Sequence, residues 1–381
     1  MSLETLGAVA DWQRGLGSPA VAADAAGNGR GDGTLDITFH GGEPLVAGAA
    51  WYREALPLLR DGLAPRKVRF AVQSNLWLLT DELCELFRDF GVSLGTSLDG
   101  PEAVNDVQRG AGYFARTMAG IERARAHAID VGAICTFTAA SVPHAAEVFD
   151  FFVRERLNFS VHAAVPSLRN PEADQWSITA EAHGELLVGL LDRYLEDPRR
   201  VRIGTLDSMA RSVSAGRGGV CTFGECLGAY LAIGPDGAIY PCQRFAGMDE
   251  YRVGDVATRP SLAEMEATPV WRRFRAREEA LATEASECAG CVHFGSCKGG
   301  CQYNALVGAG GVLGPTARDP QCMGYRRVFD RVTERALAEM FGPENLDAVV
   351  ERPDPELGLM RCGPLLAIMR DGSVYIPSVS N

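Results

Sequence analysis

Cysteine is the residue of this 381-residue sequence whose spacing points most clearly to chemistry. Eight of the eleven cysteines fall in one window, spaced C-x4-C-x15-C and then C-x2-C-x5-C-x3-C-x20-C. A secreted disulfide framework would come with an export signal, and the start MSLETLGAVADWQRG has no basic segment followed by an apolar one. Eight thiolates can fill two four-coordinate sites, and such sites favour zinc or an iron–sulfur cluster. The window predicts two metal centres and leaves zinc and iron open; the alternative is eight buried structural cysteines.

The composition restricts the partners of the chain. Hydrophobic residues make up 46% of it, enough for a sizeable core, and the length suits about two domains. Lys and Arg number 37 against 49 Asp and Glu, a net charge of −12, and no basic block offers a phosphate-binding stripe. Neither nucleic acid nor an anionic membrane surface is therefore expected as a partner. No apolar run approaches the roughly 20 residues of a membrane span, and without an export signal we expect a cytoplasmic protein.

The first part of the sequence alternates between strand and helix patterns. Val68, Phe70 and Val72 share one face of a strand, for example, and Thr80 followed by acidic residues marks the start of a helix. Repeated strand–helix–strand units predict a parallel sheet with right-handed crossovers. The start of the chain has the pattern of an amphipathic helix, two helices are expected within 178–215, and LAIGPDGAIYPC reads as a hairpin. We expect strands over 35–39, 68–72, 92–98, 131–137 and 159–165, and helices over 51–59, 81–90, 114–127 and 145–154.

Polar and glycine-rich motifs follow the first three of these strands. HGGEPL comes after the first, QSN after the second and SLDGP after the third, with Arg109 twelve residues beyond Ser97. Because the carboxyl ends of parallel strands meet at one edge of a sheet, the three motifs are expected to lie together. Each motif alone is compatible with an ordinary turn. The sequence holds no GxGxxG, Walker A, GxSxG or HExxH motif, and its six histidines show no metal-binding spacing.

Taken together, the strand-end motifs and the cysteine spacing resemble the radical S-adenosylmethionine (AdoMet) enzymes with a SPASM extension. Within that family the chain is most similar to anaerobic sulfatase-maturing enzymes and to maturases of ribosomally made peptides. The resemblance covers roughly residues 1–325. It implies an α/β fold, a partial (β/α)6 radical-SAM barrel lacking its first strand over residues 1–215. A small SPASM domain would follow over 216–325, then a C-terminal extension over 326–381.

The resemblance also implies cofactors and the residues that hold them. It favours two auxiliary 4Fe–4S clusters over zinc. In the family, the GGE segment lines the amino group of AdoMet, residues matching Ser97 and Arg109 hold its carboxylate, and the second strand end lines the cofactor. The implied AdoMet residues are Gly41, Gly42, Glu43, Ser74, Asn75, Ser97 and Arg109. The implied ligands are Cys221, Cys226, Cys242 and Cys301 for the first cluster, and Cys288, Cys291, Cys297 and Cys322 for the second.

One part of the family pattern is absent from the 381 residues. The CxxxCxxC motif, which binds the 4Fe–4S cluster that chelates AdoMet, does not occur, and Cys84 and Cys135 lack the spacing to replace it. We therefore expect this chain to bind auxiliary clusters without cleaving AdoMet, and AdoMet with a third cluster only where the missing segment is present. Three explanations are open: a mis-assigned start or truncation, a degenerate relative that binds peptides or acts as a scaffold, or a subunit that borrows its cluster.

A second departure concerns the substrate. Sulfatase-maturing enzymes carry an Asp as base directly after the third SPASM cysteine, where this sequence has Gln243. An amide is no general base at neutral pH, so formylglycine formation is disfavoured. The remaining expectation is oxidative modification or crosslinking of a precursor peptide or protein, with a reductant such as ferredoxin or flavodoxin. Cys362 is expected to be a plain thiol, and LLAIMRDGSVYI near it reads as a hairpin.

Overall fold

The structure is a computed structural model. It describes residues 1–16, 33–169, 175–197, 201–219, 221–224, 226–283, 286–341, 360–362, 366–368 and 374–375. The expected C-terminal extension lies largely outside the described residues. Its described strands are β9 (Met360–Cys362), β10 (Leu366–Ile368) and β11 (Val374–Tyr375), and the antiparallel pairing of β10 with β11 confirms the predicted hairpin.

Five parallel strands form the larger sheet, in the order β1-β2-β3-β4-β5. A parallel bridge between Phe159 and Ile203 continues the pairing beyond β5. These are the strands predicted from the sequence, although β2 runs on through Gln73 and β5 ends at Ala163. The sheet comprises β1 (Leu35–Phe39), β2 (Val68–Gln73), β3 (Ser93–Ser97), β4 (Val131–Phe137) and β5 (Phe159–Ala163).

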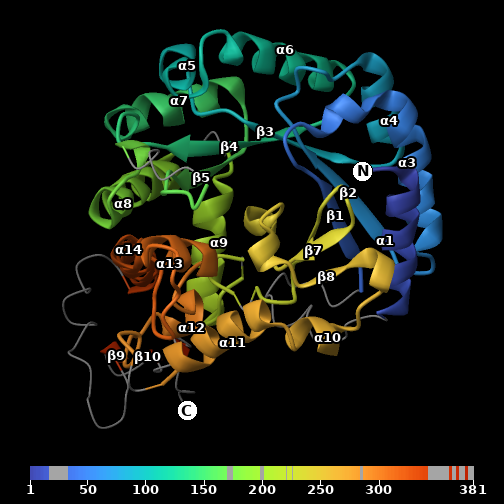
Figure 1. The fold of residues 1–381 in the computed structure, drawn as a ribbon. Coiled ribbons are helices and arrows are strands. Elements are labelled where there is room, and N and C mark those ends of the chain that lie inside the picture. Colours follow the sequence, from blue (N-terminus) through green and yellow to red (C-terminus); the bar gives the residue numbers. More distant parts are fainter. Residues whose placement is uncertain are drawn as a thin grey trace, which may run out of the picture.

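Helices cover the outer face of this curled sheet (Figure 1). Thr80 caps α4 as predicted, since its side chain accepts a hydrogen bond from the Leu83 amide. The helix α5 (Glu102–Arg109) was not among the predicted elements, because Asp99-Gly-Pro reads as a turn and the helix is only 8 residues long. The other helices of this part are α3 (Gly48–Gly62), α4 (Asp81–Asp89), α6 (Tyr113–Ala126), α7 (Ala145–Glu155), α8 (Ala180–Glu196) and α9 (Gly204–Ala215), with short turns η1 (Pro44–Ala47) and η2 (Val142–His144).

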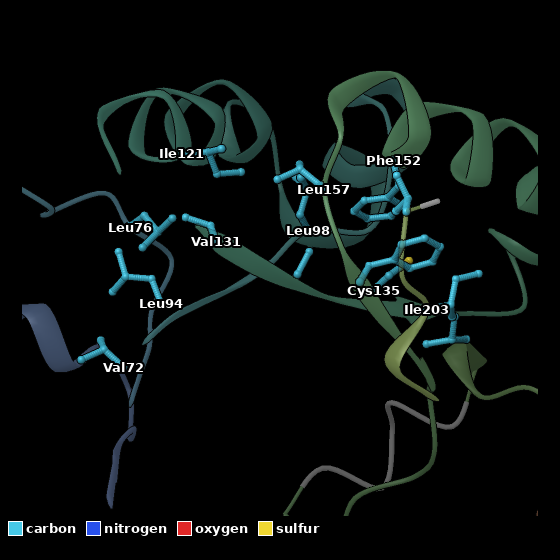
Figure 2. Packing of buried hydrophobic residues seen from close by; sticks show 14 of the residues in the cluster. Val72, Leu76, Leu94, Leu98, Ile121, Val131, Cys135, Phe152, Leu157 and Ile203 are labelled. Carbon is cyan, nitrogen blue, oxygen red and sulfur yellow. The ribbon is translucent and has the colours of Figure 1, made fainter. Parts of the chain in front are cut away.

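The two faces of the sheet differ in burial. Along β4, Val131, Ala133, Cys135 and Phe137 are buried against the helices, whereas the residues between them are more exposed. Figure 2 shows this packing, with Val131 and Cys135 on the strand, Ile121 from α6 and Phe152 from α7. The opposite face of β3 presents only small side chains, Ser93, Gly95 and Ser97. The inner face therefore offers space and polarity for a ligand, while the outer face supplies the core.

A second, smaller unit packs around its own core. The predicted hairpin is confirmed: β6 (Ala232–Ile233) and β7 (Ala238–Tyr240) pair antiparallel, and β8 (Gly254–Asp255) joins them. The core holds Tyr240, Phe245, Trp271 and Phe274. The boundary placed after residue 325 falls inside α14 (Cys322–Phe341), which packs against α8 and α9. The remaining elements are α10 (Leu262–Glu266), α11 (Pro269–Leu281), α12 (Phe294–Cys297), α13 (Gln302–Gly308), η4 (Gln243–Phe245), η5 (Asp249–Tyr251) and η6 (Val256–Thr258).

The first helix, α1 (Leu3–Gly15), belongs to both units. Leu6 and Ala10 pack into the core beneath the large sheet, whereas Val9 and Trp12 pack into the core of the smaller unit. The buried Trp12 indole donates a hydrogen bond of 2.8 Å to the Pro260 carbonyl. The amphipathic helix predicted at the start of the chain therefore packs between the two cores. Among the residues that the structure describes, no helix has the length and apolar character needed to cross a bilayer.

Replacement of Trp12 tests whether α1 packs into both cores. Trp12→Ala removes an indole that is only 2% exposed, and we expect it to lower the free energy of unfolding by about 3–5 kcal/mol. Trp12→Phe keeps most of the apolar contact, and should lower it by only about 1–3 kcal/mol because the Pro260 carbonyl is left without its donor. Urea unfolding followed by circular dichroism measures both. An Ala variant that unfolds at the same urea concentration as the parent chain would contradict the shared burial of α1.

Candidate functional site

Glu43 joins two of the predicted strand-end motifs. It follows β1, and its Oε1 accepts hydrogen bonds from the Ser74 hydroxyl at 2.7 Å and the Leu45 amide at 2.9 Å. Its Oε2 accepts one from the Asn75 amide at 3.0 Å. Ser74 and Asn75 follow β2, which pairs in parallel with β1, so both motifs lie at the carboxyl edge of the sheet. Three accepted bonds leave the carboxylate with further lone-pair capacity.

The two glycines before Glu43 form an open turn. Gly41 has a φ of +110°, a conformation that L side chains rarely adopt. The His40 Nδ1 accepts a hydrogen bond of 2.7 Å from the Gly41 amide, which holds the turn. Nothing lies within 4 Å of the place where a Cβ would stand on Gly41 or Gly42. The backbone here is therefore accessible to a ligand.

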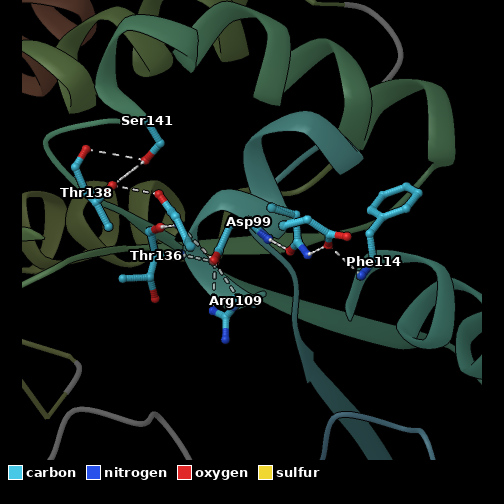
Figure 3. Close-up of polar contacts among 9 residues, drawn as sticks. Asp99, Arg109, Phe114, Thr136, Thr138 and Ser141 are labelled. Carbon is cyan, nitrogen blue, oxygen red and sulfur yellow. Dashed lines mark hydrogen bonds and ion pairs between the residues drawn. The ribbon is translucent and has the colours of Figure 1, made fainter. Parts of the chain in front are cut away.

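Asp99 organises the third strand-end motif (Figure 3). Its carboxylate is 2% exposed and lies 2.6 Å from Arg109 Nε. Its oxygens also accept hydrogen bonds from Arg109 Nη2, from the Gln108 amide group and from the Thr136 backbone N–H, each at 2.8 Å. Asp99 follows β3, the two side chains come from α5, and Thr136 lies in β4. One buried carboxylate thus fixes the end of α5 against two strand ends.

Arg109 forms an ion pair with a carboxylate of the protein itself. The structure turns the Nε and Nη2 side of its guanidinium toward Asp99, and its carbon lies 5.4 Å from the centre of the Tyr113 ring. Burial alone would lower the pKa of Arg109, but the Asp99 hydrogen bond and charge raise it overall, so the cation is permanent. Ser97, the last residue of β3, lies half-buried on the inner side of the same edge.

Burial is the largest influence on the pKa of most cysteines in the window, and the charges of other thiols add to it. Burial, and then the charges of Cys301, Cys221, Glu278 and Cys242, raise the pKa of Cys226. In the second set, burial and then the charges of Cys322 and Cys291 raise the pKa of Cys288. Burial, followed by Cys322, raises the pKa of Cys297 to about 12. Metal binding to such thiols therefore releases protons.

Cys84, Cys135 and the eight cysteines of the window are free thiols. Among the residues with a described position, no three His, Cys, Asp or Glu side chains are arranged to hold a single metal ion.

The chain passes from one set to the other between Cys297 and Cys301. Cys297 belongs to the core beneath the large sheet, whereas Cys301 and Cys242 pack against the core of the smaller unit. Burial raises the pKa of Cys301 to about 12, with Asp319 the next contribution. Asp319 accepts a hydrogen bond of 3.0 Å from the Cys301 amide. The two sets therefore sit at the junction of the two cores.

Gln243, the residue after Cys242, is exposed and carries an amide rather than a carboxylate. Gln243 begins η4, and the following Arg244 donates a hydrogen bond of 3.0 Å from Nη1 to Asn304 and stacks 4.0 Å from the Tyr303 ring centre. Burial, and then the charge of Arg244, lower the pKa of His162 near the end of β5. The end of β5 and the segment after Cys242 are therefore close in space.

Sequence reasoning did not find the residues that support this site. Asp99 stands in the SLDGP motif but reads as a turn residue, and nothing in the sequence signals that it pairs with Arg109. Gln108 and Asp319 carry no motif at all. Their role depends on burial between elements that are far apart along the chain, which a spacing pattern does not encode.

Comparisons with known proteins agree with this geometry. The sequence profile of the Radical SAM superfamily matches residues 11–145, and that of SPASM, an iron–sulfur cluster-binding domain, matches residues 221–292. A protein of Methanothermobacter thermautotrophicus named only as uncharacterized is 48% identical over 182 residues, which cover 48% of this chain and 70% of that protein. The serine-type anaerobic sulfatase-maturating enzyme of Bacteroides thetaiotaomicron is 25% identical over 318 residues, 78% of this chain and 75% of the enzyme.

A solved structure has the same fold. The structure titled native anSMEcpe with bound AdoMet and Cp18Cys peptide superposes with a TM-score of 0.72 at 21% identity, and the match covers 89% of this chain and 91% of the other. The profile matches cover β1 to β4 and the cysteines from Cys221 to Cys291, and the superposition extends over both units, which confirms the fold class expected from the sequence. The chain therefore belongs to the radical SAM superfamily and carries a SPASM iron–sulfur cluster-binding domain.

Proposed function

We propose that this chain is the AdoMet-binding and SPASM part of a radical AdoMet maturase that oxidatively modifies or crosslinks a peptide or protein. The observation that carries the proposal is the meeting of Glu43 with Ser74 and Asn75 across two neighbouring strand ends. At this carboxyl edge of the sheet, a bound cofactor would find polar side chains and the accessible backbone of Gly41 and Gly42.

The residues at this edge fit AdoMet by their chemistry. The backbone of Gly41 and Gly42 is accessible, and the Glu43 carboxylate keeps lone pairs for an ammonium group. Arg109, held by Asp99, and Ser97 are donors suited to a carboxylate. We assign Gly41, Gly42, Glu43, Ser74, Asn75, Ser97 and Arg109 to the AdoMet site.

The cysteine sets fit iron–sulfur clusters. Each set consists only of thiols, the donors that such clusters require, and within each set the charges of other thiols raise the pKa of a member. We assign Cys221, Cys226, Cys242 and Cys301 to one auxiliary 4Fe–4S cluster and Cys288, Cys291, Cys297 and Cys322 to the other. These clusters would accept an electron from the substrate or anchor it.

AdoMet bound to a reduced four-iron cluster supplies a 5′-deoxyadenosyl radical that abstracts a hydrogen atom from a substrate. The 381 residues contain no CxxxCxxC to hold such a cluster. We infer that they bind two auxiliary clusters and do not cleave AdoMet by themselves. The same observation favours a second candidate function, a non-catalytic iron–sulfur protein that binds a peptide or acts as a scaffold.

The substrate class follows from the relatives and from Gln243. Relatives named as sulfatase-maturating enzymes and a related structure with a bound peptide support a peptide or protein substrate. Gln243 is exposed beside the first cysteine set but cannot take a proton as a carboxylate does. We therefore propose a modification other than formylglycine formation, in a ribosomally made precursor, with a ferredoxin or flavodoxin as reductant in the cytoplasm.

Anaerobic reconstitution tests the cluster assignment. The 381-residue chain should take up about eight iron atoms, four in each cluster, and release no 5′-deoxyadenosine when reduced with AdoMet. Cys226→Ser should lose about four of these irons, whereas Cys135→Ala, a buried cysteine outside both sets, should keep all of them. Iron and sulfide analysis with mass spectrometry of the nucleoside products measures these outcomes.

Two results would contradict the assignment. Uptake of about two zinc ions in place of iron would mean that the thiols form mononuclear sites. Formation of 5′-deoxyadenosine by the 381 residues would mean that another group replaces CxxxCxxC.

Glu43→Gln tests the AdoMet site, in a form of the protein that carries a CxxxCxxC segment and its third cluster. The neutral amide loses a charge-assisted hydrogen bond of about 1.5–3 kcal/mol, so we expect AdoMet to bind about 10- to 100-fold more weakly. Glu54→Gln, an exposed carboxylate on α3, is the matched control and should bind AdoMet as the parent chain does. Isothermal titration calorimetry with AdoMet measures both. Equal affinity of the Glu43 variant and the parent would exclude Glu43 from the site.

A further inference from the structure

Arg277 on α11 is a buried cation held by backbone carbonyls. The residue is 1% exposed. Its Nε donates to the Ala317 carbonyl at 2.6 Å, and its Nη2 donates to the carbonyls of Gly299 and Gly300 at 2.8 and 3.4 Å. Within the described part of the chain, no carboxylate lies within the 4.0 Å of an ion pair with it. This guanidinium is therefore desolvated without a direct counter-charge.

Such a charge needs negative charge nearby. Desolvation of an ion costs several kcal/mol, and carbonyl dipoles offset only part of that. The anionic groups that act on Arg277 are, in order, Cys301, Asp319, Glu278 and Cys288. Cys301 comes from the first cysteine set and Cys288 from the second. The cation thus lies within electrostatic reach of both sets.

Arg277 also holds the segment that links the two sets. Lys298, Gly299 and Gly300 all have positive φ, of 52°, 76° and 75°. A Cβ on Gly299 would lie 2.5 Å from a Leu281 methyl carbon, and one on Gly300 would lie 2.3 Å from the Asp319 Cβ. The link has no room for side chains at either glycine, and the Arg277 guanidinium binds both glycine carbonyls. The short path from Cys297 to Cys301 therefore depends on this arginine.

We propose that Arg277 is a positioning residue shared by the two auxiliary clusters, holding the Cys297–Cys301 link and raising the reduction potential of both clusters. The inference rests on the proposed function in one respect, that the cysteine sets hold iron–sulfur clusters. A cluster bound by four thiolates carries net negative charge, and that charge sets its potential. A fixed buried cation stabilises the more negative, reduced state. The same arginine therefore favours electron acceptance by both clusters.

Reconstituted chains with Arg277→Gln or Arg277→Lys test the proposal, with Arg272→Gln as the matched control on an exposed face of α11. The readouts are iron content and midpoint potentials from a redox titration followed by electron paramagnetic resonance. We expect Arg277→Gln to lower both potentials by the equivalent of a tenfold or greater change in the reduction equilibrium, about 59 mV for one electron. Arg277→Lys keeps the charge and should shift them less than tenfold, and Arg272→Gln should not shift them.

The remaining outcomes distinguish the electrostatic role of Arg277 from its role in holding the Cys297–Cys301 link. Loss of iron from the Gln variant with retention in the Lys variant, at nearly parental potentials, would support the electrostatic role. Unchanged potentials in a fully loaded Gln variant would overturn it. Loss of iron from both variants would support the positioning role, because lysine cannot donate to all three carbonyls that Arg277 binds. A parent chain that takes up no iron would instead overturn the proposed function, whatever the variants do.

Discussion

Three residues separate Cys297 from Cys301, and within them the chain passes from one hydrophobic core to the other. A link this short can make that passage only with backbone that most residues avoid, which explains its positive φ angles and paired glycines. The buried guanidinium of Arg277 and the carboxylate of Asp319 hold the link from two sides.

The first helix is a second tie between the units. Leu6 and Ala10 pack into one core and Val9 and Trp12 into the other, and the Trp12–Pro260 hydrogen bond fixes the orientation of the helix. The inner face of the sheet meanwhile carries small and polar side chains, so the space beside the carboxyl edge is not filled by the protein's own core. A cofactor at Glu43 and a cluster at the cysteine sets would therefore be held by one connected body.

The sequence predicted the strands because they follow a short periodic pattern. Alternation of apolar residues marks β4 over its full length, Val131–Phe137, and the cysteine spacing is itself the signal for its window. Asp99 and Arg277 escaped prediction for a physical reason: each acts through burial among segments distant in sequence. The helix α5 was missed because Asp-Gly-Pro is a turn pattern. The burial of α1 against both cores was not predicted, because an amphipathic pattern does not indicate which core a helix packs against.

Anomalous diffraction at the iron absorption edge, from crystals of the reconstituted chain, tests the central claim most directly. The account predicts two separate iron peaks, one bounded by Cys221, Cys226, Cys242 and Cys301 and the other by Cys288, Cys291, Cys297 and Cys322. A single peak, a signal at the zinc edge in place of iron, or a cluster bound by Cys297 and Cys301 together would contradict it.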